Sequence, residues 1–149
     1  MKRLAVAAAA LAGVTALSGA AASPGSASTD NKAQTIKLVM HQTGFHLLGK
    51  NTFAGTDRAK SGGKFAGYDT ISGRFFPKTN KVRVQVAFAL AGGILLARAN
   101  EHGSTPQTIK YRGPILGGSG KFAGVTGRIT AHSPANDDTT TYVTLTYSP

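Results

Sequence analysis

The stretch KVRVQVAFAL at residues 81–90 decides the fold of this chain. Two sets of side chains alternate along it. The first is apolar and consists of Val82, Val84, Val86, Phe88 and Leu90, and the second is mostly polar or small and consists of Lys81, Arg83, Gln85, Ala87 and Ala89. Successive side chains of a strand point to opposite faces, so the first set lies on a core face and most of the second faces solvent. The stretch TTTYVTLTY at 139–147 predicts a second such strand, with Val143, Leu145 and Tyr147 on the core face.

Six further short runs, rich in β-branched and aromatic residues and separated by Gly, Pro, Asn and Asp, also predict strands. The eight predicted strands are TIKLVMHQ (35–42), NTFAGTDRA (51–59), KFAGYDTISGRFF (64–76), KVRVQVAFAL (81–90), GILLARANE (93–101), TIKYRGPI (108–115), VTGRITAH (125–132) and TTTYVTLTY (139–147). No segment after residue 30 has a convincing helical period. Eight short strands in one small domain predict an all-β, eight-stranded antiparallel β-barrel, because closure removes exposed strand edges.

The N-terminus, MKRLAVAAAALAGVTALSGAAAS, has the features of a secretory signal peptide. A basic start precedes an alanine-rich apolar stretch and the small residues Ala20 to Ala22. A membrane anchor is the alternative, but the stretch is short of the roughly 20 strongly apolar residues that a span needs. We expect a signal peptide at 1–22, a flexible arm at 23–34 and one β-barrel domain at 35–149, in a protein that is secreted, extracellular and not membrane-spanning. A second small-residue cleavage site lies near Ala27.

The composition is basic and lacks cysteine. The formal net charge of +11 falls to +9 without the predicted signal peptide, when 15 basic residues face 6 acidic ones. Such a balance favours anionic partners, including nucleic acid and cell-envelope polymers. The basic residues are scattered and no two are adjacent after residue 22, so we expect a solvated basic surface and no specific binding of nucleic acid. Without disulfides, stability must come from packing, sheet closure or oligomerisation.

The glycine-rich stretch GGSGKFAGVTGRIT at 117–130 does not match the motif of a phosphate-binding loop. A P-loop needs Gly at position 115 and Ser or Thr at position 122, where this chain has Ile115 and Phe122. The motif GKFAG occurs twice, at 63–67 and 120–124. Glycines before a strand permit tight turns and bulges, so we expect Phe65 and Phe122 to enter the barrel interior just past a turn.

Two acids fall on faces that are otherwise apolar. Asp69 shares its face with Phe65 and Ile71, and Asp57 shares its face with Phe53. A carboxylate on a core face is costly unless it is paired, and Arg98, which alternates with apolar residues in its strand, is a candidate partner. We predict a polar cluster of Asp57, Asp69 and Arg98 in the lumen. The alternatives are a structural ion pair, or a bulge that turns the acid outward.

Metal and cofactor sites are not indicated. His41 and His46 are five residues apart, which in a regular strand places them on opposite faces. His102 and His132 have no close partner, and the adjacent Asp137 and Asp138 fall short of a calcium loop. We expect neither a metal nor a cofactor.

The segments GTDR, GGKFAGYDTISGRF and ILGGSGKFAGVTGRITAH, with the final TYVTLTY, resemble the allene oxide cyclase and dirigent protein superfamily, in particular its small exported bacterial members. The resemblance covers about residues 35–149. It implies an eight-stranded antiparallel barrel with an apolar cavity, often assembled as a homo-trimer. In the plant members the cavity holds a reactive hydrophobic molecule and controls the stereochemistry of its cyclisation or coupling. The catalytic residues of the plant proteins are not matched here.

Two functions are compatible with these features. The first is a secreted barrel that binds a small hydrophobic molecule in its lumen, with Phe53, Phe65, Phe122 and the polar cluster as ligand-binding residues, and that steers its cyclisation or coupling without a cofactor. The second is a non-enzymatic envelope or matrix protein whose basic exterior binds anionic polymers. Binding of an apolar ligand should survive high salt, whereas polymer binding should weaken steeply.

The signal peptide predicts a processed N-terminus. Intact mass of protein recovered from the medium should place the first residue between Ser23 and Thr29, because the small-residue sites lie there. Secreted protein that still begins at Met1 would contradict this expectation.

Overall fold

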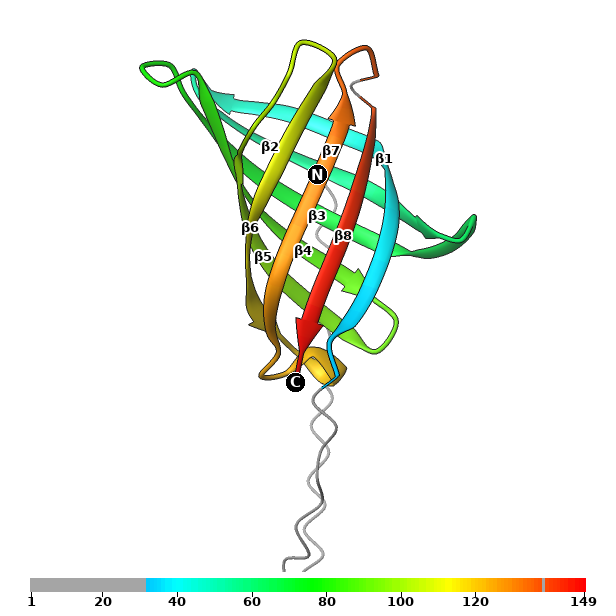
Figure 1. Cartoon of the computed structure of the whole chain (residues 1–149). Helices are drawn as coiled ribbons and strands as arrows, with labels where there is room; N and C mark the ends of the chain where they lie inside the picture. The colour runs from blue at the N-terminus through cyan, green and yellow to red at the C-terminus, as the bar shows by residue number, and fades with distance from the viewer. Residues whose placement is uncertain (1–31, 138) are drawn as a thin grey trace, which may run out of the picture.

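Eight antiparallel strands, each hydrogen-bonded to the next along the chain, form a closed barrel in the computed structural model (Figure 1). The structure describes residues 32–137 and 139–149, so the predicted signal peptide, most of the predicted arm and Asp138 lie outside the described residues. The strands are β1 (Gln34–Gly49), β2 (Thr52–Ser61), β3 (Lys64–Phe76), β4 (Lys81–Leu90), β5 (Gly93–Glu101), β6 (Thr108–Gly118), β7 (Thr126–Pro134) and β8 (Thr140–Ser148). The predicted all-β, eight-stranded barrel is confirmed.

Pairing of the first strand with the last closes the sheet. Leu38 of β1 lies opposite Val143 of β8, in a register that runs from Gln34 to His41 without a bulge. Each strand therefore has a hydrogen-bonded neighbour on both sides, although β1 beyond Gln42 pairs with β2 alone. Among the described residues, no helix is long and apolar enough to span a membrane.

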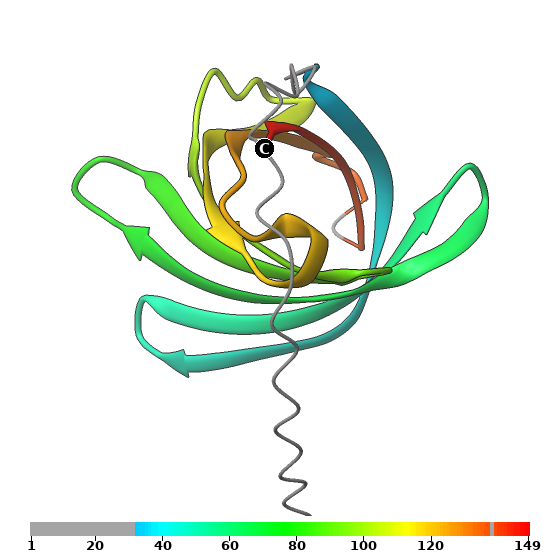
Figure 2. The ribbon, with the colours of Figure 1, turned by 90° about the horizontal axis from the view of Figure 1, so that it is seen from below.

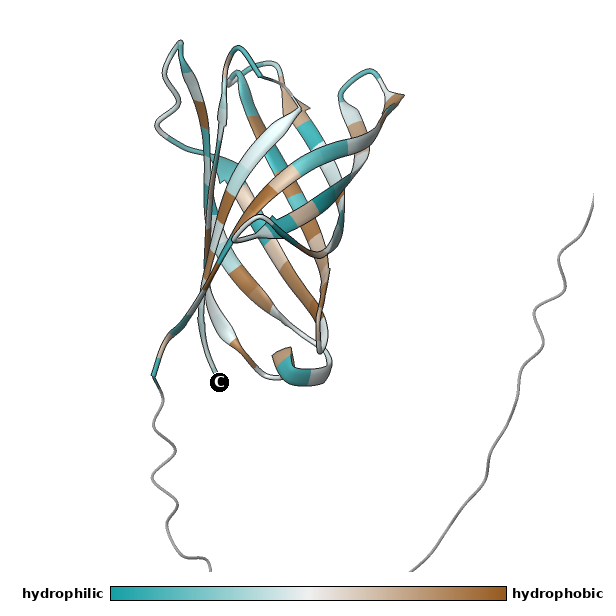
Figure 3. Cartoon of the chain, turned by 90° about the vertical axis from the view of Figure 1, so that its right-hand side faces the viewer, coloured by the Kyte–Doolittle hydropathy of each residue, from teal (hydrophilic) through white to brown (hydrophobic). Residues whose placement is uncertain are grey.

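The alternating side chains of β4 and β8 lie as their pattern predicts. Val86 and Phe88 are buried, as are Val143, Leu145 and Tyr147. Figure 3 shows the corresponding alternation of apolar and polar bands along the strands. These residues belong to one cluster of buried side chains inside the barrel.

The inner and outer faces of β5 are the reverse of those predicted. Leu95 pairs with Phe88 and faces inward, as do Ala97 and Ala99, so Arg98 is exposed on the outer face. β5 carries apolar residues on both faces, so its own pattern does not tell the inner face from the outer one. The register with β4, whose inner face is unambiguous, decides the matter.

A bulge reverses the predicted position of Phe65. Ala59 pairs with Gly67, but the next residue, Lys60, pairs with Phe65, so Ala66 is an extra residue in β3. An extra residue shifts the alternation by one, and the ring of Phe65 is consequently 53% exposed. It lies on the outer face, where the guanidinium carbon of Arg58 is 5.3 Å from the ring centroid.

A second bulge corrects the predicted arrangement of His41 and His46. The extra residue is Thr43 in β1, between the positions that pair with Asp57 and Thr56. Because of it, His41 and His46 lie opposite Arg58 and Ala54, which share the outer face of β2.

The second GKFAG copy closes the lower end of the barrel. It forms the 3₁₀ turn η1 (Gly120–Phe122), which Figure 2 shows folded under that end. The Lys121 amide donates to the Gly92 carbonyl at 2.8 Å, and Gly120 has a φ of +59° at a point where a Cβ would collide with the same carbonyl. Phe122 is fully buried, with its ring edge-on to Tyr147 at 5.6 Å. The prediction that Phe122 enters the interior is confirmed, although it does so from a turn.

The two copies of the motif should therefore differ in their contribution to stability. Phe122→Ala should lower the free energy of unfolding by about 3–5 kcal/mol, because it removes a fully buried ring. Phe65→Ala should cost about 1 kcal/mol or less, because that ring is half exposed and its contacts with Arg58 and Tyr68 are on the outer surface. Urea denaturation of both variants measures the difference. Equal costs would contradict the role of η1 as a plug.

Candidate functional site

A mostly apolar cavity of about 130 Å³ lies inside the upper part of the barrel. Its walls come from all eight strands: Met40, Phe53, Asp57, Asp69, Ile71, Val84, Val86, Phe88, Ala99, Tyr111, Ile129, Ala131, Thr141 and Val143. Cavities of about 150 Å³ with apolar walls bind benzene. The space in this lumen thus suits a molecule with one small ring.

Two carboxyl groups lie side by side in the wall of this cavity. Asp57 and Asp69 are directly opposite each other on β2 and β3, and their side chains are 7% and 3% exposed. The backbone N–H of Asp57 donates to Oδ1 of Asp69 at 3.1 Å. The two acids that were predicted to face the lumen do so.

Burial changes the protonation of this pair. It raises the pKa of Asp69 to about 8; the charge of Asp57 adds to the increase, and the hydrogen bond from the Asp57 amide partly offsets it. Burial also raises the pKa of Asp57. No cationic side chain contributes to either shift. Because two neighbouring carboxylates cannot both ionise cheaply in an apolar site, the pair holds at least one proton at neutral pH.

Arg98, the third member of the predicted cluster, is not part of the site. It lies outside the barrel opposite Gln85, for the reason of register given above. The site is therefore a carboxyl pair without an ion-pair partner among the residues that line the cavity. That arrangement leaves the acids free to interact with a bound molecule.

Phe53 lines the cavity near its upper end. Its ring lies flat over Gly73, its partner on β3, where a Cβ would collide with the ring. The ring also contacts Phe45 of β1, with centroids 5.5 Å apart. Of the three aromatic residues predicted to bind a ligand, only Phe53 lines this cavity, because Phe122 is in the plug and Phe65 is outside.

Sequence reasoning did not select two polar lining residues, Tyr111 and Thr141. Tyr111 lies on the same face of β6 as the buried Ile115, and Thr141 lies on the same face of β8 as the buried Val143. This alternation in the sequence was the signal that could have identified both residues. Burial, with a smaller contribution from the charge of Glu101, raises the pKa of the Tyr111 phenol. The phenol therefore stays protonated at neutral pH and can donate a hydrogen bond.

No group of three metal-ligating side chains comes together within residues 32–137 and 139–149. The polar chemistry of the cavity consequently consists of two carboxyls, a phenol and a hydroxyl. Such a set can donate or accept one proton and can orient a ligand by hydrogen bonds.

Solved structures share this barrel. The chain is similar to a pyocyanin demethylase, with a TM-score of 0.60 and 22% identity over 76% of this chain and 99% of the other. It is similar to a nonspecific heme-binding cyclase that catalyses a (4 + 2) cycloaddition in neoabyssomicin biosynthesis, with a TM-score of 0.64 and 13% identity over 82% and 69% of the two chains. It also resembles the Diels-Alderase AbmU from Streptomyces koyangensis, with a TM-score of 0.61 and 14% identity over 82% and 70%. No family model and no curated protein matches the chain. At these identities the similarity establishes the fold only.

The raised pKa of Asp69 predicts how stability changes with pH. The unfolded chain releases this proton above about pH 4, whereas the folded chain keeps it to about pH 8, so the free energy of unfolding falls as pH rises between these values. The slope from this group is at most about 1.4 kcal/mol per pH unit. Asp69→Asn should remove it, so the variant should gain stability relative to wild type as pH rises. Urea melts across this range measure the effect.

Asp137 provides the control for this experiment. Its carboxylate accepts hydrogen bonds from Thr139 and Thr140, which lower its pKa. Its proton is already lost in both states above about pH 5, so the difference between Asp137→Asn and wild type should stay constant there. A constant difference for Asp69→Asn as well would mean that Asp69 is an ordinary ionised carboxylate.

Proposed function

We propose that this protein binds a small, mostly apolar molecule in its lumen and steers the cyclisation or coupling of that molecule through confinement and the carboxyl pair. One observation carries the proposal: Asp57 and Asp69 are buried against an apolar cavity with no cation to neutralise them. Burying charge in this way destabilises the fold, and such costs are concentrated at functional sites.

The chemistry follows from the proton that the pair retains. With a pKa of about 8, Asp69 is a proton donor near neutral pH, and an ionised Asp57 beside it can accept a proton from elsewhere on the ligand, so that the total charge of the pair is unchanged. The best ligand has an apolar ring system with one oxygen or nitrogen that meets the acid. Walls on all sides limit the conformations of a flexible substrate, which favours ring closure or coupling in one geometry. The proposal requires only groups of the lumen itself.

Two lines of support point in the same direction. The barrels of a cyclase and a Diels-Alderase, proteins that act on small molecules, have the same fold. The sequence motifs resemble allene oxide cyclases and dirigent proteins, and we infer that this chain is a bacterial relative of those barrels. Secretion, implied by the N-terminal sequence, and the homo-trimer of that superfamily are part of the proposal.

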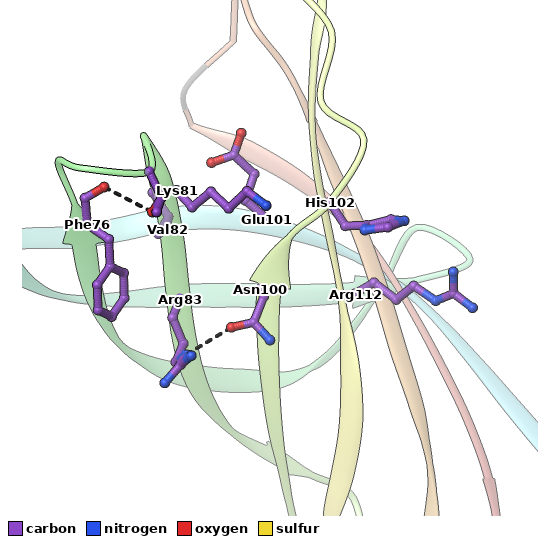
Figure 4. A pocket seen from close by; sticks show the side chains of 9 residues that line it. Phe76, Lys81, Val82, Arg83, Asn100, Glu101, His102 and Arg112 are labelled. Carbon is purple, nitrogen blue, oxygen red and sulfur yellow. Dashed lines mark hydrogen bonds between the residues drawn. The ribbon is translucent and has the colours of Figure 1, made fainter.

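The basic exterior supports a second candidate, binding of an anionic envelope polymer. A polar hollow of about 450 Å³ lies on the outside of the barrel. Figure 4 shows the side chains that line it, among which are the basic residues Lys81, Arg83 and Arg112, together with His102 and the acidic residue Glu101. Arg83 is held there by a hydrogen bond from its Nε to Oδ1 of Asn100 at 2.9 Å. Affinity that resides in this surface should fall steeply with salt, unlike affinity in the lumen.

Two molecules of the same shape test the proposed site. Pyridine should bind more tightly than benzene by about tenfold, because its ring nitrogen accepts a hydrogen bond or proton from the acid pair. Ala131→Leu should weaken both at least about tenfold by filling the cavity. Ligand-observed NMR titrations at low and high salt measure these affinities.

Ala89→Leu is the matched control, because Ala89 is exposed on the outer face of β4 and the added atoms do not enter the lumen. Both leucine variants are first checked for a native circular dichroism spectrum. Equal losses of affinity in the two folded variants, or no binding of either ring system by wild type, would rule out the lumen as a ligand site.

A further inference from the structure

Two hairpins project from the upper end of the barrel on the same side. They are the turn between β1 and β2 and the turn between β3 and β4, which Figure 1 shows extending together beyond the barrel wall. The Phe75 amide donates to the Asn51 carbonyl at 2.8 Å and joins the two near their ends. They therefore form one surface, called here the double hairpin, residues 45–56 and 72–85.

The first hairpin exposes large apolar side chains. Phe45, Leu47 and Leu48 are 51%, 75% and 68% exposed. Leu47 pairs with Phe53 and has the parity of a core residue, but it lies beyond the part of the barrel that can enclose it. Three exposed apolar residues within four positions of a projecting element are unlike the scattered single residues of an ordinary surface, and such a group marks an interaction site.

The charge of the double hairpin has one sign. Its lysines and arginines are Lys50, Arg74, Lys78, Lys81 and Arg83, and neither segment contains Asp or Glu. The guanidinium carbons of Arg74 and Arg83 lie 5.7 and 5.4 Å from the centroid of the Phe76 ring. The ring and both cations lie on the outer face of β3 and β4, whereas Leu47 has the parity of the inner face. The double hairpin thus carries exposed apolar side chains in its first hairpin and most of its cations in its second.

We propose that the double hairpin docks on a lipid surface that contains anionic headgroups. Leucine and phenylalanine side chains at the tip enter the boundary between headgroups and acyl chains, and the surrounding lysines and arginines contact the headgroups. A second copy of this chain suits the surface less well, because contact between two double hairpins would bring their cations together. An anionic polymer also suits it less well, because a polymer has no apolar region in which the exposed leucine and phenylalanine side chains could be buried.

The location of this surface matters for the rest of the molecule. Leu47 is the cross-strand partner of Phe53, whose ring lines the cavity. Docking therefore brings the upper end of the lumen close to the lipid, where apolar small molecules accumulate. The docking surface nevertheless stands on its own observations, and it would hold if the lumen bound nothing.

Vesicle sedimentation tests the proposal with the full chain. The protein should sediment with vesicles of phosphatidylglycerol and phosphatidylcholine more than with phosphatidylcholine alone, and salt should reduce binding without abolishing it. Leu47→Ser/Leu48→Ser should reduce the partition coefficient at least about tenfold. Lys50→Gln/Lys78→Gln should reduce it severalfold, and only at low salt.

Matched controls come from the outer wall and the opposite end. Ile94→Ser/Leu96→Ser removes two apolar side chains of 45% and 43% exposure from the wall, and Lys37→Gln/Lys64→Gln removes two exposed lysines far from the double hairpin. Both should leave partitioning nearly unchanged. The N-terminal apolar stretch is common to all variants, so any binding it contributes remains as a constant background.

Several results would overturn the proposal. The first is an equal loss of vesicle binding in the hairpin variants and the control variants. The second is vesicle binding that survives Leu47→Ser/Leu48→Ser but is abolished by salt, which would indicate a polymer-type site. The third is an oligomer of this chain that Leu47→Ser/Leu48→Ser dissociates. A second reporter does not depend on the serine variant folding. The chain has no tryptophan, so Leu48→Trp provides a single probe whose emission should shift to the blue with phosphatidylglycerol vesicles and stay unshifted without them.

Discussion

Closure of the sheet through the β1–β8 pairing is the constraint on which the rest of this structure depends. The chain has no cysteine and, in its described part, only a single turn of helix. Eight strands in an open sheet would leave two edges able to pair with other chains. The continuous register between Gln34–His41 and Thr140–Tyr147 removes those edges and divides every strand into an inner and an outer face. The core, the cavity and the outer surface all follow from that division.

The distribution of side-chain size along the barrel explains why the cavity lies at one end. In the lower part, Phe122, Leu95 and Leu145 are fully buried and fill the space, and η1 covers the opening. Farther up, the inward positions include Ala99 and Ala131, whose small side chains leave room between the larger ones. A narrow eight-stranded barrel holds either packed side chains or one small molecule. This chain does the first below and has space for the second above.

Within that space, the carboxyl pair is the feature that the stability of the fold does not require. Asp57 and Asp69 face each other at a position where two apolar residues would pack at lower cost. Their burial is tolerable because a proton remains on the pair, which lowers the charge inside the barrel. The same proton is what the cavity can offer to a ligand. Structural cost and chemical use thus meet in two residues, while the double hairpin provides a separate, outward-facing surface.

The amino-acid sequence by itself determined the all-β class, the eight strands and the inner faces of β4 and β8, because clean alternation leaves one arrangement of each strand. It also placed Asp57 and Asp69 inside, since no bulge lies between Asp57 and Phe53 or between Asp69 and Ile71. Only the tertiary structure decided the positions of Arg98 and Phe65. β5 is apolar on both faces, so its orientation came from pairing with β4, and the bulge at Ala66 reversed the alternation of β3. A one-residue shift moves every side chain beyond it to the opposite face of the sheet. The position of such a shift depends on the pairing with the neighbouring strand.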